Sequence, residues 1–142
     1  MTDRIFVDRL IENANIDFSK PFVWDNQPVT VQEVKDYLSA GEIGTDIPYG
    51  DGCKYMPDKK DKSYHISRVA YFVQHPKEIT DIDIDNKCEQ MYITSTAVVV
   101  DGWHRLMAAY ILGLKTIDVN YGGRDDVLEY LKGLRDEEDL ED

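Results

Sequence analysis

The sequence predicts an α+β fold in which helices surround a mixed β-sheet. Residues 97–100 and 116–120 are short runs rich in β-branched side chains, which favour strands. A helical run at 103–114 lies between these two runs. Residues 81–85 alternate Asp with Ile, a pattern typical of a strand that buries one face. The strands and helices are therefore interleaved along the chain.

The N-terminal region begins with apolar residues that lie close to a helical period. Residues 4–14 predict a short helix, or a strand that leads into a helix. Residues 15–29 are predicted to be irregular, because Pro21 and Pro28 interrupt them. Trp24 is expected to pack in the core or in a lid, and stacking on a ligand is the alternative.

A capping box then marks the start of a helix. Thr30 and Glu33 have the spacing of this motif, and the helix is predicted over residues 31–39. Residues 41–62 are rich in glycine and are predicted to form a long loop or short strands. Residues 50–52 form a turn within it and lack the Gly-Lys-Ser/Thr ending of a phosphate-binding loop.

A further amphipathic helix is predicted over residues 63–75, with Ser63 as its N-cap. The strand at 81–85 places three carboxylates on one face, which is either a solvent face or a divalent-cation site. Residues 91–100 are predicted to form an antiparallel arm, within which the valines at 98–100 read as a buried strand.

The helix at 103–114 is predicted to be buried on most sides, because residues 106–112 are all apolar. Gly113 fits its C-cap. Another helix is predicted over 124–132, and Gly133 ends it. The remaining nine residues, 134–142, carry six acids and one arginine, which predicts a disordered acidic tail.

Composition limits the possible functions. The chain has 142 residues, which suits one domain, and a net charge of −12. A protein that holds DNA by its phosphates needs the opposite charge balance, so direct DNA binding is not expected. No run is long enough to span a membrane, and the N-terminus does not resemble a signal peptide. Cys53 and Cys88 are expected to be reduced thiols, and the protein is expected to be cytoplasmic.

The charged residues of the central stretch gather at one end of its helix. Asp101, His104 and Arg105 are the only acidic, basic or histidine residues of the turn and the helix body. A helix N-terminus presents free N–H groups and a partial positive charge, so an adjacent His and Arg predict a phosphate or carboxylate site. The alternative is that Asp101 only caps the helix, while the other two side chains reach solvent.

The pattern Asp-Gly-x-His-Arg-Leu-x-Ala-Ala at residues 101–109, followed by Leu-Gly-Leu-Lys, resembles the ParB/sulfiredoxin superfamily. It is similar to the ParB-like nuclease-type domains and the free serine kinases. Trp103 stands where sulfiredoxins have their catalytic cysteine, so sulfiredoxin chemistry is not expected. The resemblance covers residues 63–133, and residues 1–62 are then an N-terminal extension of a single domain at 1–133.

The resemblance implies binding of a nucleotide, ATP or CTP with Mg²⁺, at the helix start. It implies catalytic roles for Asp101 and His104, with Asp101 as a metal ligand or base. On the preceding helix, His65, Ser67 and Arg68 are candidates for holding phosphates, and the alternative is a solvated helix face. The expected cofactor-binding residues are Gly102, Trp103, His104, Arg105, Ser67 and Arg68.

Two function classes follow. In the first, the domain binds a nucleotide and is an NTPase or phosphotransferase. In the second, it is a non-catalytic acidic protein, of the kind found in phages and mobile elements, that binds a basic host protein or mimics nucleic acid. A nuclease is less favoured, because the clustered carboxylates or histidines of a two-metal site are absent from the sequence.

Overall fold

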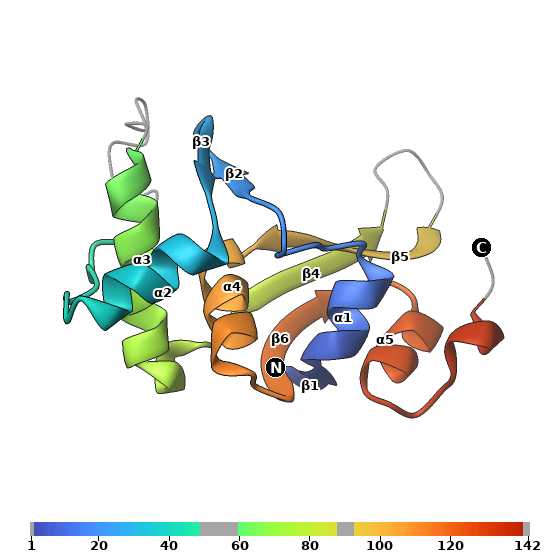
Figure 1. The fold of residues 1–142 in the computed structure, drawn as a ribbon. Helices are drawn as coiled ribbons and strands as arrows, with labels where there is room; N and C mark the ends of the chain where they lie inside the picture. The colour runs from blue at the N-terminus through green and yellow to red at the C-terminus, as the bar shows by residue number, and fades with distance from the viewer. Residues whose placement is uncertain (1, 49–59, 88–92, 141–142) are drawn as a thin grey trace.

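A four-stranded mixed sheet, five α-helices and a two-stranded hairpin make up the part of the chain that this computed structural model describes (Figure 1). The described residues are 2–48, 60–87 and 93–140. The fold is therefore α+β, as the sequence predicted. The elements in chain order are β1 (Asp3–Phe6), α1 (Val7–Asn13), β2 (Phe22–Trp24), β3 (Gln27–Val29), α2 (Val31–Ser39), α3 (Lys62–Gln74), η1 (Pro76–Glu78), β4 (Ile82–Lys87), β5 (Ile93–Asp101), α4 (Trp103–Leu112), β6 (Thr116–Gly122), α5 (Asp125–Leu131) and η2 (Glu137–Asp139).

The main sheet has the strand order β1-β6-β4-β5. Strand β6 pairs antiparallel with β1 and parallel with β4, and β5 pairs antiparallel with β4. The N-terminal segment was expected to be an extension of a core at 63–133. It supplies an edge strand of the sheet instead, in which the buried Ile5 lies opposite Ile117.

Burial alternates along the central strands, so one face of the sheet is covered and the other is open. The prediction that residues 98–100 form a strand is confirmed, but the prediction that the run is buried is wrong. Val98 and Val100 are 55% and 63% exposed, because alternate side chains of a strand point to opposite faces. The buried residues of these strands are Ile82, Ile84, Ala97, Val99, Ile117 and Val119.

Helices α1 and α5 both contact β1 and β5, the two edge strands, and α3 packs on α4. Helix α4 ends at Gly113, which has the left-handed φ of 69° that a C-cap requires. Its burial is less complete than predicted, since Tyr110 and Leu112 are 41% and 36% exposed. Among the described residues, no helix has the length and apolar character needed to cross a lipid bilayer.

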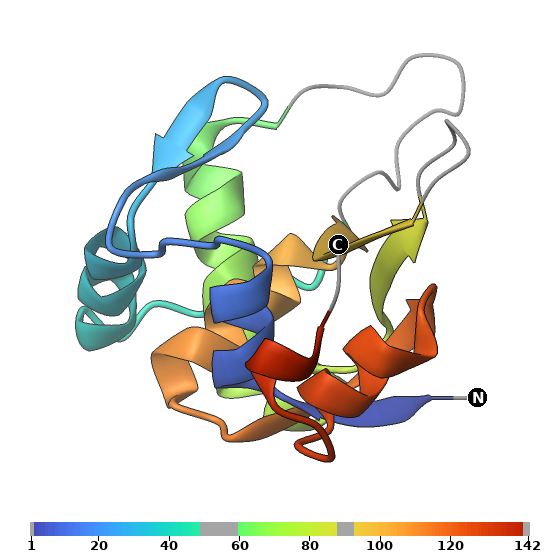
Figure 2. The same ribbon diagram turned by 90° about the vertical axis from the view of Figure 1, so that its right-hand side faces the viewer.

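A β-hairpin occupies part of the region that was predicted to be irregular. Strands β2 and β3 pair antiparallel, with Val23 opposite Pro28. The turn residues Asp25 and Asn26 have φ values of 51° and 64°, the backbone that a two-residue hairpin turn needs. Pro28 is tolerated because a two-stranded ribbon has free edges. Figure 2 shows the hairpin beside the first turns of α3.

The capping box of α2 is confirmed: Glu33 N–H donates to Thr30 Oγ1, and Thr30 N–H donates to the Glu33 carboxylate. Helix α3 begins one residue earlier than predicted. Asp61, not Ser63, is its N-cap, and its carboxylate accepts from the Tyr64 N–H at 2.9 Å. A carboxylate also suits the positive end of the helix dipole better than a hydroxyl does.

Several predictions fall outside the described residues. The turn at 50–52 and both cysteines, Cys53 and Cys88, belong to this group. Residues 41–48 carry no strand or helix, in agreement with the loop predicted there. Reduced thiols therefore remain a prediction.

A disordered tail was predicted from residue 134, but the described residues 134–140 contact the rest of the domain. Arg9 Nη1 donates to the carbonyls of Tyr130 and Arg135, at 2.9 and 2.7 Å. The short helix η2 follows, and Leu140 packs against the core. One arginine that binds two carbonyls and one anchoring leucine are enough to hold a segment whose composition alone favours disorder.

The free edge of β5 is partly closed by a side chain. Asn13, the last residue of α1, donates from Nδ2 to the Ser95 carbonyl at 2.8 Å. Its Oδ1 accepts from the Ala97 N–H at 2.7 Å. The amide of Asn13 thus makes the two hydrogen bonds that a neighbouring strand would make.

Candidate functional site

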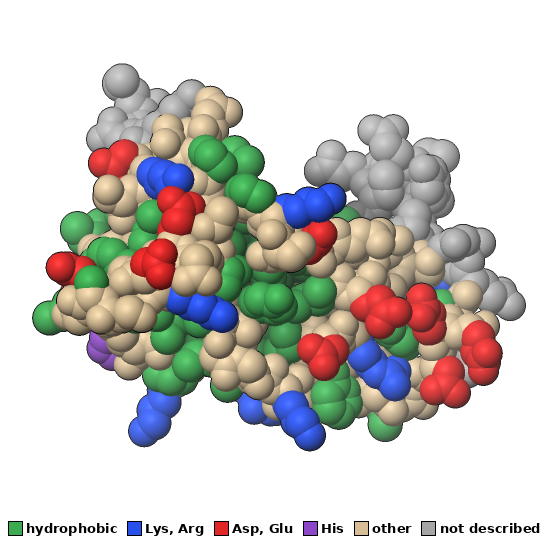
Figure 3. Space-filling model, in the orientation of Figure 1, with side chains coloured by type: hydrophobic (Ala, Val, Ile, Leu, Met, Phe, Trp, Pro, Cys, Tyr) green, Lys and Arg blue, Asp and Glu red, His purple; other side chains and the backbone are tan. Residues whose placement is uncertain are grey.

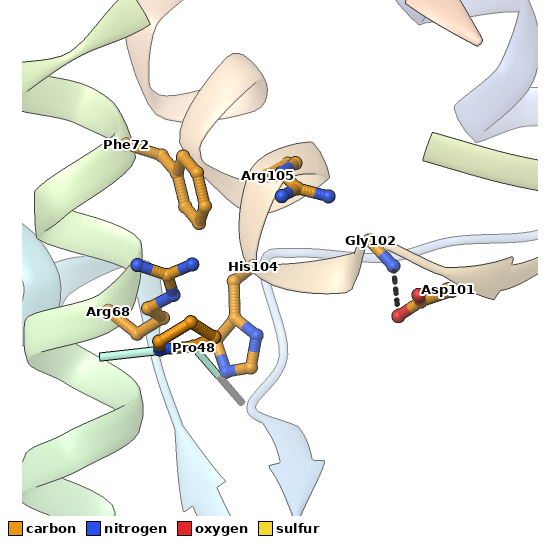
Figure 4. Close-up of a pocket in the computed structure, with 7 residues that line it drawn as sticks. All are labelled: Pro48, Arg68, Phe72, Asp101, Gly102, His104 and Arg105. Atoms are coloured by element: carbon orange, nitrogen blue, oxygen red, sulfur yellow. Dashed lines mark hydrogen bonds between the residues drawn. The ribbon is translucent and has the colours of Figure 1, made fainter. Parts of the chain in front are cut away.

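A cavity of about 130 Å³ lies where β5 turns into α4 (Figure 4). Five of its lining residues are ones that the sequence nominated, and they come from α3, the end of β5 and the start of α4. Pro48 and Phe72 complete the wall. The lining residues are Pro48, Arg68, Phe72, Asp101, Gly102, His104 and Arg105.

Gly102 makes the sharp turn at the cavity possible. Its φ is 98°, and a Cβ at this position would lie 3.1 Å from both Cα and Cγ1 of Ile82. Only glycine meets both constraints without strain. Gly102 is also the N-cap of α4, and no side chain of the described residues caps this helix. The partial positive charge of the helix end therefore remains at the cavity.

Asp101 is exposed, and its carboxylate accepts a hydrogen bond from the Gly102 N–H at 2.8 Å. Within the described residues, no group of three His, Cys, Asp or Glu side chains could hold a metal ion. The aligned carboxylates of β4 do not form one either, and Asp83 accepts from Asn120 Nδ2 at 2.9 Å. Asp101 could contribute one oxygen to Mg²⁺ that is otherwise bound by phosphates, the usual arrangement for this ion.

Two arginines approach the ring of Phe72. The Cζ atom of Arg68 lies 4.4 Å from the ring centroid, and that of Arg105 lies 5.0 Å from it. Arg68 Nη1 donates to the Thr45 carbonyl at 3.2 Å. Arg105 Nε is buried and has no hydrogen-bond partner among the described residues. The cavity therefore concentrates positive charge.

The positive charge of Arg105 acts on Arg68. Burial, followed by repulsion from Arg105, lowers the pKa of Arg68. Among the described residues, no salt bridge involves either arginine. A bound anion would relieve this repulsion.

A chain of hydrogen bonds leads away from the cavity into the protein. His104 Nε2 lies 2.9 Å from His65 Nδ1, and His65 Nε2 lies 3.0 Å from Asp25 Oδ2. The same Asp25 oxygen accepts from the Lys60 N–H at 3.2 Å. Three segments distant in sequence, the hairpin turn, α3 and α4, thus meet through polar side chains.

Trp24 lies flat against both imidazoles. Its ring centroid is 4.4 Å from that of His104 and 5.3 Å from that of His65, with interplanar angles of 8° and 12°. Tyr64 meets both imidazoles edge-on. His65 has no exposed surface, whereas His104 is 7% exposed and lines the cavity, and the stacking fixes both ring planes.

Burial determines the charge of these histidines. It lowers the pKa of His104 to about 3, with smaller contributions from His65, Arg68 and Arg105. Burial also lowers the pKa of His65, although the hydrogen bond to Asp25 opposes this shift. Both imidazoles are therefore neutral near pH 7.

Three sequence candidates do not line the cavity: Trp103, Ser67 and His65, of which His65 belongs to the hydrogen-bond chain. The ring of Trp103 stacks on Phe22 at 4.4 Å, and Phe18 meets it edge-on. Ser67 Oγ lies 3.1 Å from the hydroxyl of Tyr37. The side chains of Trp103 and Ser67 face away because they lie on the packing sides of their helices.

Sequence reasoning missed Asp25, Phe72 and Pro48, and it expected Trp24 to pack in the core or a lid, or to stack on a ligand, but not to stack on two histidines. The two turn residues at 25 and 26 were the available signal, since Asp-Asn pairs tolerate left-handed backbone. Recognising that turn would have indicated a hairpin. It would not have shown that Asp25 in the turn hydrogen-bonds to His65.

No family model, curated protein or solved structure matches this chain. The assignment of the site therefore depends on its own geometry.

Proposed function

We propose that this protein binds the phosphate groups of a nucleotide in the cavity at the start of α4. The observation that carries the proposal is the pair Arg68 and Arg105, which face one cavity together with an uncapped helix N-terminus. Arg105 Nε, buried without a partner among the described residues, is a donor for which a phosphate oxygen is the natural acceptor.

The size of the cavity indicates which part of the ligand it takes. Its volume of about 130 Å³ lies below the roughly 300–1,000 Å³ of pockets that enclose a whole small molecule. It suits a terminal phosphoryl group, with the sugar and base outside. Mg²⁺ would enter with the phosphates of ATP or CTP, and Asp101 is the carboxylate that lines the cavity among the described residues.

The sequence pattern supports the same ligand class. Residues 101–105, Asp-Gly-Trp-His-Arg, resemble the nucleotide-binding turn of ParB-like domains and free serine kinases. The reaction class that this resemblance favours is NTP hydrolysis or phosphoryl transfer, with Asp101 and His104 closest to the reacting group.

Calorimetric titration of ATP, CTP and pyrophosphate with Mg²⁺ tests the proposal. Arg105→Ala should weaken binding about tenfold to a hundredfold, since it removes a charge-assisted hydrogen bond worth roughly 1.5–3 kcal/mol. Arg105 is the better choice because Arg68 also holds the loop carbonyl of Thr45.

Arg4→Ala is the matched control. Arg4 pairs with Asp118 on the sheet edge and has a side chain that is 60% exposed. Its loss changes the net charge equally, so it should leave the affinity unchanged. Absence of binding to wild type at millimolar concentration, or an equal effect of both substitutions, would refute phosphate binding at this site.

Partner binding through the acidic surface is a second candidate. Figure 3 shows acidic side chains gathered over α5 and the C-terminal segment. Acidic residues of these two segments include Asp125, Asp126, Asp136, Glu137 and Glu138. Such a surface suits a basic protein, and loss of activity in cells after its charge reversal, with nucleotide binding intact, would favour this function.

A further inference from the structure

The hydrogen-bond chain from Asp25 to His104 has one polarity when both imidazoles are neutral. An ionised carboxylate only accepts, and Asp25 already accepts from a backbone N–H. His65 must then donate from Nε2 to Asp25, which leaves its Nδ1 as an acceptor. His104 in turn donates from Nε2 to His65, and the lone pair of His104 lies on Nδ1.

We propose, building on the proposed phosphate binding, that Asp25, His65 and His104 form a proton relay that makes the cavity a site of phosphoryl hydrolysis. His104 lines the cavity and is the catalytic base. His65 and Asp25 are positioning residues that fix the tautomer of His104 and receive the charge. Trp24 keeps the two rings in nearly one plane, at 9° to each other.

The reaction balances as follows. The oxygen of a water molecule forms a bond to the terminal phosphorus, and the bond from that phosphorus to the bridging oxygen breaks. The electron pair of the broken bond stays on the leaving nucleoside diphosphate. The proton of the water passes to His104 Nδ1, while the Nε2 proton of His104 passes to His65 Nδ1. The added charge therefore resides on His65, beside the Asp25 carboxylate.

This charge shift explains why a pair of histidines is useful here. A cation on His104 would face Arg68 and Arg105, whereas a cation on His65 faces Asp25. The relay thus moves positive charge from a cationic cavity to a carboxylate. In the part of the chain that the structure describes, the charged and titratable groups around it include Asp25 on the hairpin, Asp61, Tyr64 and Arg68 on or before α3, and Arg105 on α4.

Release of inorganic phosphate from ATP and CTP with Mg²⁺ tests the relay in the full chain. His65→Gln is the informative variant, since its amide can accept from His104 and donate to Asp25 but cannot take up a proton. We expect kcat to fall about a hundredfold, with the nucleotide affinity changed by less than about twofold. His75→Gln, an exposed histidine outside the site, should leave both quantities unchanged.

A pH profile separates a relay from a merely structural chain. Asp25→Asn keeps a hydrogen-bond acceptor but removes the charge that favours protonated His65. The acidic limb of kcat/KM should therefore move to lower pH, with a lower plateau. An unchanged limb, or full activity of His65→Gln, would overturn the relay.

Nitrogen NMR of the wild-type imidazoles gives a readout that needs no variant or ligand. Both histidines should be neutral at pH 7.5 and protonated at Nε2, and any other tautomer would overturn the relay. Binding of ATP or CTP without phosphate release would overturn the relay and leave the proposed function intact. Absence of binding would overturn both.

Discussion

His104 and Arg105 are neighbours on the first turn of α4, but their surroundings differ. The imidazole of His104 is stacked on Trp24 and hydrogen-bonded to His65, so the fold itself holds it in place. The guanidinium of Arg105 lies over Phe72, and its Nε has no partner in the described part of the chain. One half of the site is organised by the protein before any ligand arrives.

The two halves of the site therefore differ in what they contribute. The histidine half consists of Trp24, His65 and His104, and the arginine half consists of Arg68 and Arg105. The histidine half depends on packing between the hairpin and α3, which are distant in sequence. Substitutions there should lower the free energy of unfolding. The arginine half contains two positive charges close together. Substitutions there should weaken ligand binding and change the free energy of unfolding less. The following predictions test that contrast, from the largest expected effect to the smallest.

Trp24→Ala should lower the free energy of unfolding by about 3–5 kcal/mol, because it removes a buried ring that packs on both histidines. Urea denaturation followed by circular dichroism measures the change. Trp103→Phe is the comparison, since Trp103 lies outside the cavity. It should cost only about 1 kcal/mol and leave nucleotide affinity unchanged. A cost for Trp24→Ala below that of Trp103→Phe would contradict the contrast.

Acidification should lower the free energy of unfolding, because the folded protein holds His104 in its neutral form. The folded-state pKa of His104 is lowered from 6.5 to about 3, so below pH 6.5 the unfolded chain binds a proton that the folded chain excludes. Stability is therefore complete above pH 6.5 and falls as the pH decreases toward 3. Between pH 7 and pH 5, His104 alone should account for about 2 kcal/mol.

Urea denaturation at a series of pH values measures this loss. His75→Gln should keep the dependence, whereas His104→Gln should flatten it over the same interval. The pKa shifts of Asp17, Glu33 and Asp126 are downward from values below 5, so these carboxylates contribute at lower pH. An equal slope in all three proteins would show that His104 titrates normally.

The two arginines should differ in their contribution to folding. Arg68→Met loses the hydrogen bond to the Thr45 carbonyl and should cost about 1–2 kcal/mol. Arg105→Met keeps the packing on Phe72 and relieves repulsion, so thermal unfolding should change by less than about 0.5 kcal/mol. Equal destabilisation by the two would mean that Arg105 also has a structural role.

Truncation after Gly133 should have the smallest effect. It removes the Arg135 carbonyl bound by Arg9 and the packing of Leu140, for a loss of about 1 kcal/mol. For a chain of this size the melting temperature should fall by only a few degrees. Scanning calorimetry measures it, and nucleotide affinity should stay unchanged, since none of the segment's described residues lines the cavity.

Local patterns predicted much of the fold. The strand, glycine turn, helix and strand that span residues 97–120 follow from β-branched runs, an apolar helical run and two glycines. The capping box predicted where α2 begins. The start of α4 likewise pointed to Asp101, Gly102, His104 and Arg105, all of which line the cavity.

The rest depends on contacts between distant segments. Pro21 and Pro28 concealed the hairpin, because a proline penalises a central strand but not a two-stranded ribbon. Without the hairpin, neither Trp24 nor Asp25 could be placed beside His65. His65 was expected on a phosphate-binding or solvated face, and it is fully buried. Burial of a polar residue by a partner 40 positions away leaves no local pattern.

The amide of Asn13 has a consequence for how copies of this protein behave in concentrated solution. Strand β5 lies at a sheet edge and carries the exposed Val98 and Val100, features that promote strand-to-strand aggregation. Asn13 already uses the Ser95 carbonyl and the Ala97 N–H, so an incoming strand finds these two positions taken. The side chain of Asn13 thus occupies backbone groups of β5 directly before the exposed valines. It thereby opposes the addition of further strands and the growth of fibres.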